Sequence, residues 1–187
     1  DTAAGPVAGS TATDGDGVLR ATLVSVPPRT VGLDDADAAE LLAALGWSAD
    51  DLDVALPPRV AYAGAWHPVL AVATRRRLAD LDYDFPRLAT LMAARDWTTV
   101  ALVHRVGPRE WAVRNPFPPG GVVEDPATGA AAAAFGGYLR ELGLVTPPTS
   151  LTIRQGDDLG RPSVIDVDIP VDGGIAVSGT AVPIPAV

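Results

Sequence analysis

Alternating apolar and polar residues predict a β-hairpin near the start of the chain. Residues 18–26 alternate in the manner of a strand with one buried face, and residues 14–17 before them (Asp-Gly-Asp-Gly) have the composition of a tight turn. Pro27 and Pro28 then close the strand, because proline cannot donate a hydrogen bond to a sheet. We therefore expect residues 1–30 to form a hairpin.

The remaining pattern predicts helices mixed with many short strands. A helix is expected over residues 34–45, where acidic residues stand in the first turn and Gly46 follows as a stop. A second is expected over residues 84–95, and a short one opens at Ser48 and ends before Pro57. Strand-like runs occupy residues 60–73, 98–106, 110–114, 151–153, 163–169 and 175–184.

Residues 126–142 form the most distinctive segment of the pattern. They are apolar on nearly every side and rich in alanine, and a helix of that kind is normally enclosed by the rest of the fold. Strand-like runs precede and follow this segment. The arrangement predicts an α+β fold in which a curled mixed β-sheet wraps around a central helix, rather than a doubly wound parallel sheet.

Composition narrows the possible chemistry. The net charge of −9 argues against nucleic acid or an anionic membrane as the main partner. The chain has no cysteine, and all fourteen basic residues are arginine. Thiolate nucleophiles, cysteine metal sites and lysine Schiff bases are therefore excluded within this chain.

The distribution of apolar residues also indicates where in the cell the protein is expected. No apolar run approaches the ~20 residues that span a bilayer. The first residues have neither the basic head nor the apolar core of a signal peptide. We expect a cytoplasmic protein that does not interact with membranes.

Asp125 is the main candidate for chemistry. It stands directly before Pro126 at the start of the expected central helix, where an aspartate side chain can cap free backbone amides. On the residues alone, such a cap is the first interpretation and a catalytic carboxylate is the alternative. The same helix start, with its free amides and positive dipole end, is a potential anion site. Glu124 is expected to be a solvated loop acid.

The two histidines are expected to be structural. His67 and His104 lie far apart in the sequence, each within a predicted strand. Two histidines without any cysteine do not suffice for a structural zinc site. We therefore expect no structural zinc site.

Several motifs, taken together, resemble the PhzF-like family of phenazine-biosynthesis-type isomerases. They are residues 114–117 (Arg-Asn-Pro-Phe), 121–129 (Gly-Val-Val-Glu-Asp-Pro-Ala-Thr-Gly) and 137–139 (Gly-Tyr-Leu), followed by 153–156, 160–163 and 177–182. The resemblance extends in order over nearly the whole chain. It implies the fold of diaminopimelate epimerase, which has two similar lobes, each a sheet curled around a central helix. The active site then lies in the cleft between the two helix N-termini.

The resemblance also implies roles for individual residues. Asp125 takes part in a proton shift on a small cyclic metabolite that carries a carboxylate. Thr128, Gly129 and Ala130 bind the substrate, the last two through their backbone amides. Many family members have serine where this chain has Ala130, so one hydrogen-bond donor is absent. The family needs no cofactor, and its glutamate base and partner histidine come from the first lobe.

By the same resemblance, the chain looks like the C-terminal two-thirds of such an isomerase. Residues 1–30 correspond to the end of the first lobe, residues 31–175 to the second lobe, and residues 176–187 to a closing strand that possibly returns to the first. The first-lobe motifs are absent from this sequence. We expect a separate N-terminal lobe chain, or a homodimer, as the partner.

Two other functions remain open at this point. The lobe could bind a small carboxylate, or act in assembly, without catalysing a reaction, because the base is absent and Ala130 lacks a hydroxyl. An epimerase of the diaminopimelate type ranks last, because that chemistry uses one cysteine from each lobe.

Overall fold

The computed structural model describes residues 8–13 and 15–182, and it is built from short strands, α-helices and single 3-10 turns. The strands are β1 (Ala8–Thr13), β2 (Leu19–Val24), β3 (Arg29–Gly32), β4 (Arg59–Tyr62), β5 (Trp66–Ala71), β6 (Ala101–Arg105), β7 (Glu110–Phe117), β8 (Val122–Asp125), β9 (Thr149–Gln155), β10 (Ser163–Ile169) and β11 (Ala176–Thr180). The helices are α1 (Asp35–Leu45), α2 (Arg75–Ala79), α3 (Phe85–Arg95) and α4 (Gly129–Glu141), with 3-10 turns η1 (Ala49–Asp51), η2 (Pro118–Gly120) and η3 (Asp157–Leu159).

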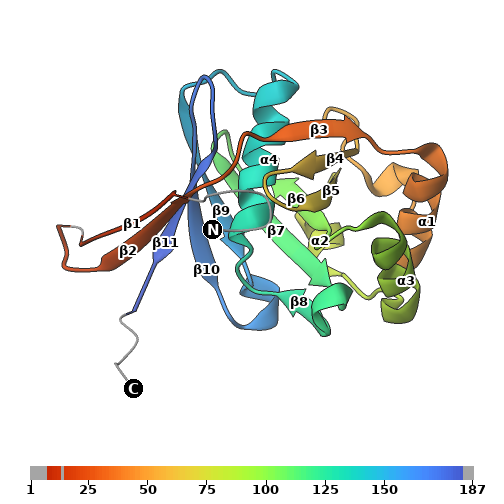
Figure 1. Ribbon diagram of the computed structural model, residues 1–187. Coiled ribbons are helices and arrows are strands. Elements are labelled where there is room, and N and C mark those ends of the chain that lie inside the picture. Colours follow the sequence, from red (N-terminus) through yellow and green to blue (C-terminus); the bar gives the residue numbers. More distant parts are fainter. Residues whose placement is uncertain (1–7, 14, 183–187) are drawn as a thin grey trace.

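The strands join into one curved mixed sheet. Its order is β1-β2-β11-β10-β9-β7-β6-β5-β4-β3, and β8 pairs with β7 beside this path. The pairs β5–β6 and β7–β9 are parallel, and the other pairs are antiparallel. The sheet curls around α4, which lies in its hollow (Figure 1). The predicted α+β design, with a sheet wrapped around a central helix, is confirmed.

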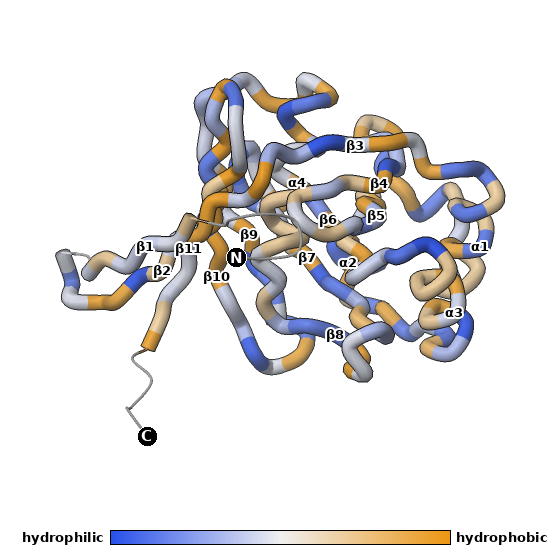
Figure 2. Tube along the Cα trace, in the orientation of Figure 1, coloured by the Kyte–Doolittle hydropathy of each residue, from blue (hydrophilic) through white to orange (hydrophobic). Residues whose placement is uncertain are grey.

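Helix α4 forms the centre of the larger core. Every residue from Ala131 to Leu139 is buried, as the apolar composition of the segment requires. Phe135 packs edge-on against Trp111 of β7, with ring centroids 4.8 Å apart. The backbone of α4 also approaches the loop before β3 closely, because a β-carbon on Gly137 would lie 2.3 Å from Cβ of Pro28. Along the chain trace, apolar colours concentrate on α4 and the strands around it (Figure 2).

Helices α1, α2 and α3 cover the other face of the sheet from β4 to β7. Their buried residues, including Leu41, Leu78 and Met92, form a second core with Val60 and Leu102 of the sheet. Strands β5 and β7 are consequently buried on both faces, whereas β9 and β10 alternate between buried and exposed residues. This second helical layer was not predicted from the sequence.

The boundaries of most elements agree with the predictions. Asp34 caps α1 by accepting from the amide of Ala36, and Gly46 ends that helix at φ 65°. The helix predicted from Ser48 onward is wrong beyond one turn, because it ends at Asp51 and residues 52–58 contain no helix. The predicted last strand covers Ala176–Thr180, and the remainder of that prediction beyond residue 182 lies outside the described residues.

The predicted hairpin is present as β1 and β2, and β2 continues the sheet by pairing with β11. It extends beyond the body of the molecule (Figure 1). Residues 1–7 and 14 of the predicted hairpin and turn lie outside the described residues. The assignment of residues 1–30, 31–175 and 176–187 to different lobes stays a prediction.

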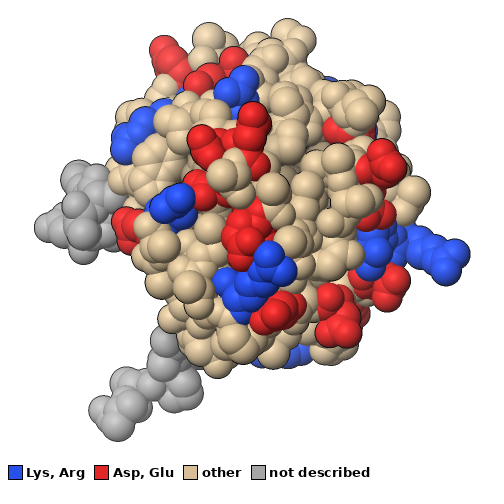
Figure 3. All heavy atoms as spheres, turned by 90° about the vertical axis from the view of Figure 1, so that its right-hand side faces the viewer, with Lys and Arg blue, Asp and Glu red and all other residues tan. Residues whose placement is uncertain are grey.

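Carboxylates are spread over the side of the molecule that carries α1 and α3, with arginines between them (Figure 3). Two ion pairs join these helices there: Arg87 with Glu40 at 2.7 Å and Arg95 with Asp37 at 2.6 Å. Within the described part of the chain, no helix is both long enough and apolar enough to cross a bilayer.

Candidate active site

Asp125 lies at the junction between β8 and α4. It is the last residue of β8 and pairs with Asn115 of β7. The helix begins at Gly129, with Thr128 in the N-cap position. The prediction of a helix starting at Pro126 with Asp125 as its cap is therefore wrong. The physical reason is that β8 extends through Asp125, so that residues 126–128 form a turn before the helix.

The carboxylate of Asp125 is held by donors from this turn. Its Oδ1 accepts from the amide of Ala127 at 3.3 Å, and its Oδ2 accepts from the hydroxyl of Thr128 at 2.8 Å. Gln155, at the end of β9, donates from Nε2 to Oγ1 of Thr128 at 2.9 Å. The single hydroxyl hydrogen of Thr128 is therefore free to point at Asp125.

Gln155 connects the two segments that form this site. Its Nε2 also donates to the backbone oxygen of Asp125 at 2.7 Å, and its Oε1 accepts from the amide of Thr128 at 3.2 Å. The residue is 1% exposed, so these bonds are shielded from water. Gln155 fixes both ends of the turn, a role that the sequence did not predict although Gln155 belongs to one of the quoted motifs.

Two residues support the turn of residues 126–128. They are Ser163, the first residue of β10, and Gly156, which follows Gln155. The hydroxyl of Ser163 donates to the backbone oxygen of Pro126 at 2.8 Å. A β-carbon on Gly156 would lie 2.9 Å from that same oxygen and 2.2 Å from the oxygen of Arg161, and Gly156 has φ 82°. Only glycine suits this position, because a side chain would both clash and strain the backbone.

The start of α4 presents free backbone donors beside Asp125. The amides of Gly129 and Ala130 have no hydrogen-bond partner among the described residues. Ala130 is exposed and Gly129 is half-buried, so both are open to a ligand. Free amides at the positive end of a helix dipole favour an anion such as a carboxylate.

Glu124 is buried, so its prediction as a solvated loop acid is wrong. Its side chain is 1% exposed and pairs with Arg114 of β7 at 2.7 Å. Arg114 also donates to the backbone oxygen of Ala79 at 2.8 Å. The pair thereby fastens β8 to β7 and to the end of α2.

Tyr83 lies close to this ion pair. Its hydroxyl donates to the backbone oxygen of Val123 at 2.5 Å. Burial, with a further contribution from the charge of Glu124, raises the pKa of Tyr83 to about 12. Tyr83 therefore stays protonated at neutral pH and holds β8 as a hydrogen-bond donor.

The histidines are not part of this arrangement. His67 is fully buried in β5, where its Nδ1 bonds to the hydroxyl of Thr99 at 2.9 Å, and His104 in β6 bonds to the backbone oxygen of Val72 at 3.0 Å. In the described ranges, no three His, Cys, Asp or Glu side chains are grouped to hold a metal ion. The structure brings Asp125, Thr128, Gly129 and Ala130 together at one helix end, and their roles stay predictions.

This geometry can support two chemical functions, which are the binding of an anion and the exchange of a proton. Each carboxylate oxygen of Asp125 accepts one bond from the chain and retains a further acceptor position for a proton. The adjacent free amides can bind a negative group within reach of that carboxylate. Proton exchange with a bound carboxylate compound is therefore chemically possible at this helix end.

Comparisons with known proteins place this chain in a wider group. The family described as "Phenazine biosynthesis-like protein" matches residues 1–186. An uncharacterized isomerase of Deinococcus radiodurans is 35% identical over 137 residues, which is 72% of this chain and 44% of that protein.

Two solved structures are similar in fold. A PhzF-family phenazine biosynthesis protein of Bacillus anthracis matches with a TM-score of 0.79 at 18% identity, covering 98% of this chain and 64% of that one. A predicted epimerase of Pseudomonas aeruginosa matches with a TM-score of 0.75 at 30% identity, covering 93% of this chain and 59% of that one. The chain thus spans less than half of the Deinococcus relative and about three-fifths of each solved structure.

Proposed function

Because this chain belongs to the phenazine biosynthesis-like family, we propose that it supplies one wall of the active site of a cofactor-independent isomerase. The reaction is a proton shift between carbons of a small cyclic metabolite that carries a carboxylate. The observation that carries the proposal is the position of Asp125, held beside the free amides of Gly129 and Ala130. The names of the isomerase and epimerase relatives add support for this reaction class.

Each group has a defined role in this proposal. The amides of Gly129 and Ala130 bind the substrate carboxylate, with Thr128 fixing their approach through its bond to Gln155. Asp125 accepts a proton from, or returns one to, a substrate carbon. Enclosure by a second lobe would exclude water and strengthen these electrostatic contacts.

The second lobe is part of the proposal. The glutamate base and histidine that the family resemblance implies are absent from these residues, and the relatives are longer than this chain. We therefore propose that a complementary lobe carries them. It is either a separate chain or a further segment of the same protein.

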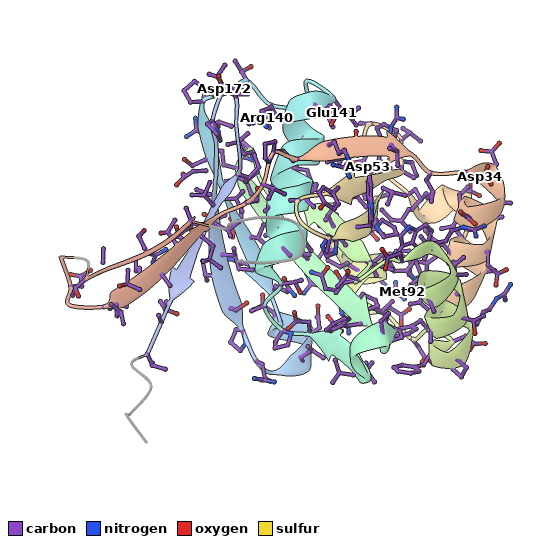
Figure 4. The ribbon with its side chains drawn as sticks, in the orientation of Figure 1. Asp34, Asp53, Met92, Arg140, Glu141 and Asp172 are labelled. Carbon is purple, nitrogen blue, oxygen red and sulfur yellow. The ribbon has the colours of Figure 1, made fainter. Side chains whose placement is uncertain are left out.

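The test uses this chain co-expressed with the part of the Pseudomonas aeruginosa protein that it does not cover. The purified complex is incubated in heavy water with a panel of cyclic carboxylic acids, and NMR measures deuterium incorporated at carbon. Asp125→Asn, which preserves size and removes the proton-accepting charge, should lower incorporation by roughly 10²–10⁴-fold. Asp172→Asn is the control, because Asp172 lies beside Arg140 at the opposite end of α4 (Figure 4).

One alternative is favoured by a specific observation. Ala130 offers no hydroxyl, and both oxygens of Asp125 already accept bonds from the chain, which would suit a lobe that binds a carboxylate without catalysis. Titration with benzoate, followed by amide NMR shifts at Gly129 and Ala130, measures binding alone. Binding without any deuterium incorporation by the complex would favour this alternative, whereas incorporation sensitive to Asp125→Asn would exclude it.

A further inference from the structure

Polar side chains occupy the inner face of the sheet at the end where α4 begins. His67 of β5, Thr99 just before β6 and Asn115 of β7 are 0%, 1% and 1% exposed. Each stands two positions along the chain from a residue of the apolar core around α4, so by strand alternation His67 and Asn115 face that core. Polar groups buried to this degree require an explanation, because an apolar side chain of similar size would be easier to bury there.

These three side chains form a chain of hydrogen bonds that runs in one direction. The hydroxyl of Thr99 donates to Oδ1 of Asn115 at 3.1 Å, and Nδ1 of His67 lies 2.9 Å from the same hydroxyl. A threonine hydroxyl has a single hydrogen, so His67 is the donor in its bond to Thr99. Because Oδ1 of Asn115 is taken, the chain of bonds ends at Nδ2 of Asn115, which is a donor.

This terminal donor of Asn115 is buried without a partner. Its Nδ2 has no hydrogen-bond partner among the described residues, and it is shielded from water. A buried donor of this kind destabilises a folded protein, and such groups are therefore rare in native structures. Thr99 holds the amide in this orientation, so Asn115 cannot satisfy Nδ2 by turning the amide over.

Asp125 is the neighbour of Asn115 across the strands. The two residues are direct partners in the antiparallel pairing of β7 and β8, and the side chains of such a pair stand on the same face with β-carbons about 5 Å apart. Each carboxylate oxygen of Asp125 accepts one bond, from Ala127 or from Thr128, and retains a further acceptor position. The unused donor and the unused acceptor capacity therefore lie at one strand pair.

The other acidic side chain of β8 is not available to Asn115. Arg114 precedes Asn115 in β7 and points to the opposite face, where it pairs with Glu124 and donates to the end of α2. Asp125 is thus the acidic residue of β8 that shares a face with Asn115.

We infer that Asn115 is a positioning residue for Asp125, and that its Nδ2 donates to the Asp125 carboxylate when an anion occupies the start of α4. This inference rests on the proposed function, and it adds the group that orients the proton-accepting carboxylate. Hydrogen bonds in active sites often tighten only when the substrate is bound. A donor on a carboxylate fixes the direction of its remaining lone pairs, so that the same oxygen faces the substrate carbon. Thr99 and His67 contribute indirectly, by holding the amide of Asn115.

The hydrogen bond can be measured in the chain alone. NMR identifies the side-chain amide signals of Asn115 by their loss in Asn115→Leu, and benzoate serves as the anion. Saturation with benzoate should move one of the two amide proton signals downfield. Asp125→Asn should abolish this shift, whereas Asp172→Asn, at the opposite end of α4, should retain it. Signals of Asn115 that are the same in the unaltered chain and in Asp125→Asn, with and without benzoate, would overturn the inference.

Kinetics of the complex with the uncovered part of the Pseudomonas aeruginosa protein separate positioning from a structural role. Asn115→Leu should lower the maximal rate of deuterium incorporation by roughly 10–100-fold, because the carboxylate is no longer oriented. The half-saturating concentration of the acid should change less than about twofold, because the amides that bind it are retained. Combined with Asp125→Asn, the same change should alter the residual rate less than about twofold. A structural role predicts equal losses with and without Asp125→Asn.

Thr99 provides a second, milder test of the same chain of bonds. Thr99→Val keeps the shape of the side chain and removes the hydroxyl, whereas Thr99→Ser keeps the hydroxyl. Circular dichroism verifies that each variant folds. Thr99→Val should lower the maximal rate, and Thr99→Ser should keep most of it. Equal rates in these two variants would contradict the inference.

The outcomes separate this inference from the proposed function. If the benzoate shift at Asn115 depends on Asp125 but the complex incorporates no deuterium into any tested acid, the isomerase assignment is contradicted and the hydrogen bond to Asp125 stands. An active complex in which Asn115→Leu has no effect, or an equal effect with and without Asp125→Asn, contradicts the positioning role alone.

Discussion

Among single residues, the buried His67 is a group whose ionisation is coupled to folding in mild acid. Its Nδ1 donates to Thr99, whose hydroxyl donates to Asn115 at 3.1 Å, and its Nε2 has no partner within the described residues. Burial lowers the pKa of His67 to about 4, and a hydrogen bond to Thr99 acts weakly in the opposite direction. The imidazole is therefore neutral in the folded protein at any pH well above 4.

This lowered pKa predicts a loss of stability in mild acid. Between pH 6.5 and 4 the unfolded chain protonates His67 while the folded chain does not, so the folded state loses about 1.4 kcal/mol per pH unit from this group. His67→Gln should make the free energy of unfolding, measured with urea, fall less steeply across this range. Equal slopes for His67→Gln and the unaltered chain would contradict the assignment.

At the residue scale, a contact could be predicted from the sequence where the two residues that make it are close in the chain. The helix stop at Gly46 was predicted because its contacts are local, whereas Asp34, which was expected inside the helix, is its N-cap. The role of Asp125 as a site residue stays a prediction, and its predicted capping role was wrong, because β8 extends through it. Gln155 and the burial of Glu124 were missed, since their partners lie 27 and 10 residues away and only the folded sheet brings them together.

At the scale of elements, β8 is held against the body by the buried pair of Glu124 and Arg114. Removing one partner leaves a buried charge without compensation, which costs roughly 3–5 kcal/mol. We expect Glu124→Ala to lower the free energy of unfolding by about this amount in urea titrations. Val123→Ala is the neighbouring control. Val123 is 62% exposed, so its change should stay within about 0.5 kcal/mol.

Replacing both members of the pair distinguishes a buried charge from lost packing. Glu124→Met combined with Arg114→Met removes both charges and should recover part of the stability that Glu124→Ala loses. Recovery will be incomplete, because Arg114 also donates to the backbone oxygens of Leu78 and Ala79. A double variant less stable than Glu124→Ala would contradict this explanation.

The fit of α4 inside the sheet depends on two adjacent glycines. A β-carbon on Gly137 would meet the rigid ring of Pro28 at 2.3 Å, whereas one on Gly136 would lie 3.0 Å from methyl groups of Ile175 and Val167. Overpacking costs about 1–3 kcal/mol, and alanine returns up to about 1 kcal/mol of helix propensity. Thermal and urea unfolding should show a larger loss for Gly137→Ala than for Gly136→Ala. The reverse order would contradict the proposed contact with Pro28.

Element-scale prediction was accurate for the central helix and the hairpin. The apolar run in residues 126–142 required enclosure, and α4 is enclosed, although it begins at Gly129. The helical layer of α1, α2 and α3 was not predicted. Because that layer covers the second face of the sheet, β5 and β7 are buried on both faces. A short apolar run in the sequence does not reveal by itself which element packs on each side of a strand.

At the scale of the whole molecule, one half of the sheet has helices on both faces and the other half has a helix on one face only. In the second half the outer face is polar, and the inner face passes from buried at Val167 to exposed at Leu23. This asymmetry could not be derived from local patterns, because Leu23 and Val177 alternate as ordinary strand residues. The change from buried to exposed residues on the inner face depends on how far α4 extends over the strands.

The pairing of β2 with β11 also has a consequence for synthesis on the ribosome. The hydroxyls of Thr22 and Ser178 bond to each other although 156 residues separate them. At roughly 5–20 residues per second, the hairpin therefore waits on the order of ten to thirty seconds before its sheet partner emerges. During that interval the edge of β2 that later pairs with β11 has no strand beside it. Demand for a chaperone should be greatest in this interval.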